Sequence, residues 1–227
     1  MKTEIFLDTA NIDEINDILP WGIIKGVTTN QKIFLKEKGV NFEEQSKKIL
    51  KIVYPHPVSL EGPNNLDELV ETAREYNTWG KNVIIKVPML ADGSGLKAVN
   101  ILESEGIKTN VTAMMSANQA FLAVTAGASY ASLFFNRIRD SGDDPVEVIK
   151  QSRAIIDEGG YKTKLIVGSI RNPNDVVEIA SAKPHIITIP YKILDQMPYH
   201  ETTVKTLKEF EQAWEEFKAA EKTIVTV

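Results

Sequence analysis

Short apolar segments and longer amphipathic segments follow one another in a regular order along this chain. Short, mostly apolar runs bounded by Gly, Pro or Asn indicate buried strands, and longer segments with apolar residues at helical spacing indicate amphipathic helices. We expect strands at Ile5–Leu7, Ile23–Val27, Val58–Glu61, Val83–Pro88, Ile107–Thr112, Tyr130–Phe135, Lys164–Gly168 and His185–Pro190. We expect helices at Ile12–Leu19, Phe42–Val53, Leu66–Tyr76, Leu96–Leu102, Ser116–Gly127, Val146–Ile156, Val176–Ala180 and Val204–Lys222.

This order of elements predicts an α/β fold. Strands that alternate with helices form a parallel sheet, and eight such units in a chain of 227 residues are typical of one closed barrel. No linker, low-complexity tract or shift in composition divides the chain. We therefore predict a single (β/α)8 TIM barrel domain spanning residues 1–227, with a long C-terminal helix.

The fourth expected strand, Val83–Pro88, contains a lysine among apolar residues. Lysine is rarely buried unless it is paired or takes part in chemistry. Burial disfavours the charged form of an amine, and a neutral amine can attack a carbonyl group. The alternative is that Lys86 marks the end of the strand and extends its amine to water.

The barrel prediction brings other polar side chains close to this lysine. In such barrels the active site forms at the carboxyl ends of the strands. Taken singly, Asp8 and Asn30 could be helix caps, Asn110 and Thr112 strand-end hydrogen-bonding residues, and Glu61 a turn residue. Their joint occurrence favours a Schiff-base site. The polar or aromatic residues at the expected strand ends are Asp8, Thr28, Thr29, Asn30, Glu61, Lys86, Asn110, Thr112, Ser132, Phe134, Ser169, Arg171 and Thr188.

Composition excludes several other classes of function. The net charge of −5 gives no basic surface for nucleic acid or for an acidic membrane. The chain has no cysteine, and no apolar run approaches the roughly 20 residues of a membrane span. The N-terminus lacks the pattern of a signal peptide, so we expect a cytoplasmic protein.

The remaining residues suggest no competing chemistry. His56 and His185 precede expected strands, at the end of the barrel away from the lysine, and His200 lies in the last connection. No pair of histidines has the spacing of metal ligands, so we expect no metal. Ser169 lacks the setting of a nucleophile elbow, and no glycine-rich nucleotide fingerprint is visible, so we expect no cofactor.

Several motifs, in order along nearly the whole chain, resemble the small transaldolases, a family that also contains fructose-6-phosphate aldolase. The resemblance implies a metal-free class I mechanism on a barrel whose Schiff-base lysine lies on strand four, and that this lysine is Lys86. The motifs are Phe6–Asn11, Gly26–Asn30, Lys86–Met89, Gly106–Thr112, Ser116–Ala120 and Arg171–Pro173.

The resemblance also implies roles for the other site residues. Asp8 matches the aspartate that transfers a proton during carbon–carbon cleavage. Glu61 and Thr112 match the pair that positions the catalytic water. Arg137 and Arg171 match the arginines at the phosphate. The implied substrate-binding residues are Thr28, Asn30, Asn110, Ser132, Phe134, Arg137, Ser169 and Arg171.

Two positions favour the transaldolase branch over the aldolase branch. The aldolases resemble this chain but carry Tyr at the position of Phe134 and Gln at that of Glu61. The resemblance implies transfer of a dihydroxyacetone unit between sugar phosphates of the pentose phosphate pathway. The expected reaction interconverts two pairs of sugar phosphates. One pair is sedoheptulose 7-phosphate with glyceraldehyde 3-phosphate, and the other is erythrose 4-phosphate with fructose 6-phosphate. An aldolase that releases dihydroxyacetone, a variant acting on a related anionic sugar, and a binding protein without turnover are the alternatives.

The chain departs from the family pattern near the expected mouth. Asn-Pro-Ser-Leu is replaced by Asn30–Ile33, and Ser-Ala-Glu-Val by Ser59–Gly62. Ser-Pro-Phe-Val-Gly-Arg is replaced by Ser132–Arg137, which places Asn136 where the family has glycine. These departures leave the exact donor and acceptor sugars open.

The C-terminal helix bears on the expected partners. Phe210, Trp214 and Phe217 form an apolar stripe, which can pack on the protein's own core or on a partner. The resemblance implies a homo-oligomer, either a pentamer or a pair of stacked pentamers, in which this helix crosses a neighbouring subunit. We expect small-molecule sugar phosphates as substrates and neither nucleic acid nor membrane as a partner.

Overall fold

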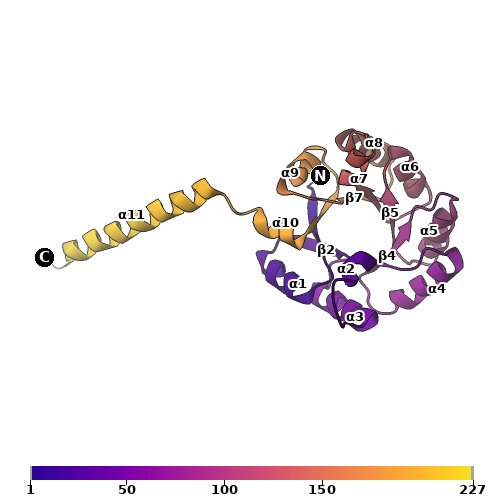
Figure 1. Ribbon diagram of the computed structural model, residues 1–227, viewed down its shortest axis with the longest axis horizontal. Helices are drawn as coiled ribbons and strands as arrows, with labels where there is room; N and C mark the ends of the chain where they lie inside the picture. Colours follow the sequence, from indigo (N-terminus) through magenta and orange to yellow (C-terminus); the bar gives the residue numbers. More distant parts are fainter. Residues whose placement is uncertain (1, 226–227) are drawn as a thin grey trace.

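The computed structural model describes the chain from residue 2 to residue 225, and the side chains up to residue 221. Eight parallel strands form a closed barrel in chain order, so each strand pairs with its neighbours in sequence and β8 pairs with β1 (Figure 1). The predicted (β/α)8 TIM barrel is thus confirmed. The strands are β1 Glu4–Asp8, β2 Ile24–Thr28, β3 Val58–Glu61, β4 Val83–Pro88, β5 Thr109–Met114, β6 Tyr130–Phe134, β7 Lys164–Gly168 and β8 Ile186–Pro190.

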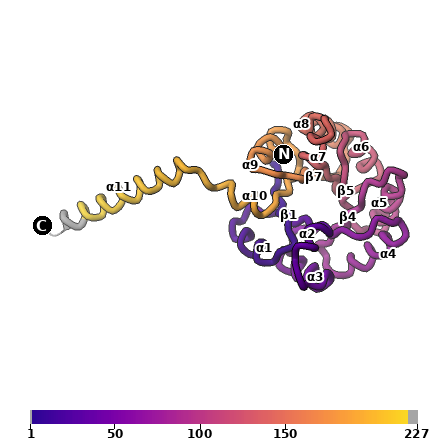
Figure 2. Tube along the Cα trace, viewed as in Figure 1, coloured from indigo at the N-terminus to yellow at the C-terminus, as the bar shows by residue number. Residues whose placement is uncertain are grey.

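Helices surround the barrel, and the trace in Figure 2 passes round the ring in sequence order. The strands are almost fully buried because helices cover them from outside. The helices are α1 Ile12–Ile18, η1 Leu19–Trp21, α2 Gln31–Phe34, α3 Phe42–Val53, α4 Leu66–Asn77, α5 Ser94–Ser104, α6 Ala117–Thr125, α7 Phe135–Asp140, α8 Pro145–Glu158, α9 Pro173–Ser181, α10 Tyr191–Gln196 and α11 Glu201–Val225.

Three short helices, α2, α7 and α10, were not predicted. Each follows the carboxyl end of a strand and has four to six residues, which is too short to show a helical period. The expected sixth strand therefore ends one residue early, and Phe135 begins α7. These helices matter for function because two of them carry residues that line the barrel mouth.

Asparagine side chains cap the first turn of several helices. The Asn11 carboxamide oxygen accepts hydrogen bonds from the backbone of Asp13 and Glu14, so Asn11 caps α1. Asn30 caps α2 by accepting from the backbone nitrogen of Ile33 at 3.0 Å. The helix-cap alternative for Asn30 is therefore correct, and this residue also lines the mouth.

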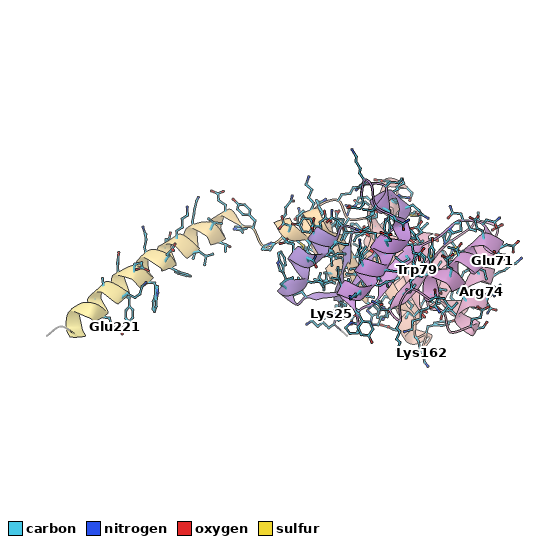
Figure 3. The ribbon with its side chains drawn as sticks, turned by 90° about the horizontal axis from the view of Figure 1, so that it is seen from below. Lys25, Glu71, Arg74, Trp79, Lys162 and Glu221 are labelled. Carbon is cyan, nitrogen blue, oxygen red and sulfur yellow. The ribbon has the colours of Figure 1, made fainter. Side chains whose placement is uncertain are left out.

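The last helix, α11, leaves the barrel. It begins at Glu201, three residues before the predicted start, and extends away from the other elements (Figures 1 and 3). Phe210, Trp214 and Phe217 are 64%, 57% and 55% exposed, and the last two rings stack with centroids 5.7 Å apart. The apolar stripe therefore does not pack on the barrel of its own chain.

Candidate active site

Lys86 lies at the centre of the barrel mouth. Strand register places Glu61 of β3 and Asn110 of β5 beside it, one on each neighbouring strand. Side chains at the same level of paired strands lie on the same face of a sheet. The polar groups of three strands therefore converge inside the mouth, as the sequence predicted.

Lys86 is buried, with 6% of its surface exposed, so its amine does not extend to water. The ammonium nitrogen Nζ donates to the backbone oxygen of Thr29 at 2.8 Å. Nζ lies 3.6 Å from Oε2 of Glu61. This distance is short enough for an ion pair but too long for a direct hydrogen bond. The lysine is thus held in one position beside a carboxylate.

Asp8 supplies a second carboxylate from the end of β1. Thr28 donates from its hydroxyl to Oδ1 of Asp8 at 2.7 Å and also shares a hydrogen bond of 2.6 Å with Thr188. Burial raises the pKa of Asp8, and the opposing effects of the Lys86 charge, the Thr28 hydrogen bond and Lys36 do not cancel it. A carboxylate with a raised pKa is suited to exchange protons.

Ser132 lines the mouth and is hydrogen-bonded to Asn110, which is buried. Ser132 donates to Oδ1 of Asn110 at 2.7 Å, and Nδ2 of Asn110 is 3.3 Å from the hydroxyl of Ser59. By contrast, Oγ1 of Thr112 is buried and has no hydrogen-bond partner within the described chain. Buried hydroxyls are almost always paired, so this free hydroxyl is available to a molecule in the cavity.

A cavity of about 140 Å³ opens over these residues. A second hollow of about 250 Å³ adjoins it, and the two share Asn30, Lys86, Thr112, Phe134 and Arg137. Glu61 lines the second hollow together with Gln31, Lys32 and Asn64. The predicted site residues that line the first cavity are Asp8, Thr28, Asn30, Lys86, Thr112, Ser132, Phe134, Arg137 and Ser169; Gly168 and Thr188 also line it.

Phe134 and Arg137 form one side of both hollows. The guanidinium carbon of Arg137 lies 5.0 Å from the centroid of the Phe134 ring, within range of a cation–π contact. Sequence patterns alone did not reveal this contact, because Phe134 ends β6 and Arg137 lies in α7, a helix too short to be predicted. Phe134 therefore holds the cation at the mouth.

Arg171 and Asn110 are the two predicted site residues that line neither hollow. The guanidinium of Arg171 is 55% exposed and makes a two-pronged ion pair with Asp140 of α7. The hydrogen bond from Arg171 lowers the pKa of Asp140. Asn110 is fully buried behind Ser132. Contact of either residue with substrate stays a prediction.

Across the side chains that the structure describes, no cluster of three His, Asp or Glu residues has an arrangement that could hold a metal ion. His185 directly precedes β8 and His56 lies two residues before the start of β3, both at the barrel end opposite the lysine. None of the helices, over the part of the chain described, is long and apolar enough to cross a membrane.

Comparisons with known proteins agree with this geometry. The model of the Transaldolase/Fructose-6-phosphate aldolase family matches residues 5–226. A "probable transaldolase" of Caldicellulosiruptor saccharolyticus is 44% identical over 214 residues, which cover 93% of this chain and 97% of the relative. A "probable transaldolase" of Symbiobacterium thermophilum is 41% identical over 216 residues, covering 95% of this chain and 98% of the relative.

A solved structure adds evidence on the fold alone. A mandelate oxidase variant crystallised with 2-hydroxy-phenylacetamide superposes with a TM-score of 0.58 over 90% of this chain and 70% of its own. Only 12% of the residues are identical, so the likeness says nothing about chemistry. The match of the family model and of the two relatives extends over almost the whole barrel. This chain is therefore an enzyme of the transaldolase type and belongs to the Transaldolase/Fructose-6-phosphate aldolase family.

Proposed function

We propose that the enzyme moves a dihydroxyacetone unit between sugar phosphates through an imine formed on Lys86. The observation that carries this proposal is a primary amine, almost fully buried, in a polar cavity beside two carboxylates. A buried lysine is a suitable nucleophile for a ketone. A protonated imine accepts the electrons released by carbon–carbon cleavage, so the reaction needs no metal at this step.

In the proposed reaction, the Lys86 amine adds to the C2 carbonyl of a ketose phosphate. The resulting carbinolamine loses water and becomes a protonated imine. Asp8 then removes the proton of the C4 hydroxyl while the C3–C4 bond breaks, and an aldose phosphate leaves. The bond electrons move to the imine and give a three-carbon enamine, which attacks the aldehyde carbon of the acceptor sugar. The raised pKa of Asp8 supports its role in this proton transfer.

Glu61 and Thr112 serve the steps in which water is lost and regained. Oε2 of Glu61 lies 3.6 Å from Nζ of Lys86, close enough to reach the neighbouring imine carbon through one water molecule. The unpartnered hydroxyl of Thr112 faces the same space, because Thr112 lines both hollows. A water held by these two groups would attack the imine in hydrolysis.

Phe134 supports transfer over release of dihydroxyacetone. A hydroxyl at this position could help to protonate the enamine, and a phenylalanine has none. The enamine then persists until an acceptor aldehyde arrives. The proposed reaction converts sedoheptulose 7-phosphate and glyceraldehyde 3-phosphate into erythrose 4-phosphate and fructose 6-phosphate, and it runs in both directions. The second candidate is an aldolase that acts at the same site and releases dihydroxyacetone.

The phosphate end of the sugar is assigned to Arg137 and Ser169. Arg137 lines both hollows and is held by Phe134, and Ser169 lies at the carboxyl end of β7, where many barrels bind phosphate. An arginine offers two parallel donors that match phosphate geometry. The pair between Arg171 and Asp140 must open before Arg171 can join this contact.

Incubation with fructose 6-phosphate, with and without erythrose 4-phosphate, tests the proposal. A transaldolase gives sedoheptulose 7-phosphate and glyceraldehyde 3-phosphate when the acceptor is present, and little dihydroxyacetone when it is absent. Equal release of dihydroxyacetone in both reactions would identify an aldolase. If neither reaction gives a product, the remaining candidate is a protein that binds sugars without converting them.

We also propose that α11 packs on a second copy of this chain in a cytoplasmic homo-oligomer. Its apolar stripe is more than half exposed in the single chain and extends clear of the barrel (Figure 3). Large apolar side chains gathered on one face usually mark a protein interface. Family membership supports the same arrangement.

A further inference from the structure

A hydrogen-bonded cluster behind the mouth joins the two segments that carry the proposed phosphate contacts. Its centre is Asp175 of α9, whose side chain is 1% exposed. Oδ2 of Asp175 accepts from the backbone nitrogen of Arg171 at 2.8 Å and from Nδ2 of Asn136 at 2.6 Å. Oδ1 accepts from Asn172 at 3.1 Å and from Arg139 at 3.3 Å. Helix capping by Asn172 accounts for only part of this set.

Asn136 extends the cluster to Ser169. Its Nδ2 donates to the backbone oxygen of Ser169 at 2.9 Å, and its backbone nitrogen is 3.3 Å from the same oxygen. Ser169 has a φ of +63°, a left-handed conformation that residues other than glycine seldom adopt. The two bonds from Asn136 hold Ser169 in this conformation, with Ser169 lining the cavity.

The cluster therefore fixes one segment relative to the other. Asn136 is the neighbour of Arg137 on α7, whereas Ser169 and Arg171 follow β7. Burial alone would raise the pKa of Asp175, but hydrogen bonds from Arg171, Asn136 and Asn172, with the charge of Arg139, lower it. The carboxylate thus stays ionised and keeps accepting hydrogen bonds from these donors. A glycine in place of Asn136 would make none of these side-chain bonds.

We propose that Asn136 and Asp175 form a clamp that positions Ser169 and Arg137 for the anionic end of the substrate. The clamp thereby sets the preference for phosphorylated over unphosphorylated sugars. This inference rests on the proposed function, because that function assigns the phosphate to Arg137 and Ser169. Both residues of the clamp act through their neighbours, since neither lines the cavity.

The variant Asn136→Ala tests the clamp, with fructose 6-phosphate and unphosphorylated fructose as donors. We expect kcat/KM for the phosphorylated donor to fall roughly tenfold, because a charge-assisted contact loses its alignment. We expect the loss with fructose to stay under about threefold, because the contacts at the imine are unchanged. The change should be mainly in KM.

Asn82→Ala is the matched control. Asn82 is also a buried asparagine, and its Nδ2 donates to the backbone oxygens of Leu50 and His56 at 3.1 and 2.8 Å. It lies just before β4, at the end of the barrel away from the mouth. We expect this variant to lose stability as Asn136→Ala does, while keeping the wild-type ratio of activities on the two donors.

Two outcomes would overturn the clamp. One is an equal loss on both donors by Asn136→Ala, which would mean a purely structural role. The other is wild-type activity on both donors, which would mean that the side chain of Asn136 positions nothing. If Asn136→Ala is insoluble, Asp175→Asn, which keeps the size of the side chain, takes its place in the same comparison.

A binding measurement separates this inference from the proposed function. Inorganic phosphate should raise the melting temperature of the wild type and raise that of Asn136→Ala much less, whether or not either protein transfers sugars. Failure of the wild type to transfer dihydroxyacetone would contradict the proposed function. An equal phosphate effect in the two proteins would contradict the clamp alone.

Discussion

The unpartnered hydroxyl of Thr112 is expected to lower the stability of the fold while it raises the activity of the enzyme. Its Oγ1 is buried and lacks a partner within the described chain. A buried polar group without a partner costs about 1–3 kcal/mol of stability. If the hydroxyl takes part in the reaction, its catalytic role outweighs this loss of stability. Removal of the hydroxyl should then stabilise the fold and reduce the catalytic rate.

Thr112→Val is the perturbation, because valine has nearly the shape of threonine without the hydroxyl. We expect the free energy of unfolding to rise by about 1–3 kcal/mol. In a chain of this size, about 1 kcal/mol raises the melting temperature by about 2–4 °C. We expect kcat to fall roughly a hundredfold, in the range that a positioned proton-transfer group contributes.

Thermal unfolding followed by circular dichroism, at one fixed protein concentration, gives the stability, and the transfer reaction gives kcat. Ser46→Ala is the matched control, because Ser46 on the outer helix α3 has the other buried hydroxyl without a partner in the described side chains. This control should gain stability and keep full activity. A Thr112→Val enzyme that is less stable than the wild type, or equally active, would refute the reasoning.

Three further predictions concern the branch of the family, the pH dependence and the oligomer. Phe134→Tyr should raise release of dihydroxyacetone relative to transfer by roughly tenfold, because the phenol can protonate the enamine; a wild type that already releases as fast as it transfers would contradict this. Burial raises the pKa of Asp8 above its ordinary value of 3.8. Protonated Asp8 therefore stabilises the fold fully below pH 3.8, and this stability is lost as the pH rises through the pKa of Asp8 in the folded protein. Asp8→Asn should therefore raise the melting temperature at neutral pH, and a gain that persists below pH 3.8 would be inconsistent with that cause. Truncation before Thr203 should reduce the molar mass measured by light scattering, and an unchanged oligomer would rule out packing through α11.

Much of the fold could be predicted from the sequence because the strands are buried runs with clear ends. The strand around Lys86 has the predicted bounds, and the strands beginning near Ile23 and Ile107 are displaced by one or two residues. The short helices α2, α7 and α10 could not be predicted, because four to six residues carry no period.

The positions of the polar strand ends were predicted more fully than the contacts that these residues make. The polar strand ends around Lys86 do converge, since parallel strands bring their carboxyl ends to one edge. The pairing of Arg171 with Asp140 and that of Asn136 with Asp175 join residues more than 30 positions apart. Such pairs depend on how α7 and α9 pack, which no local pattern records.

The central claim is that Lys86 forms an imine with a ketose phosphate. Reduction with borohydride in the presence of fructose 6-phosphate converts such an imine into a stable amine, and peptide mass spectrometry then locates it. We predict loss of activity together with labelling of Lys86, no labelling in Lys86→Ala, and no effect of a chelator on turnover. Labelling of a different lysine, or retention of full activity after reduction with substrate, would contradict the account.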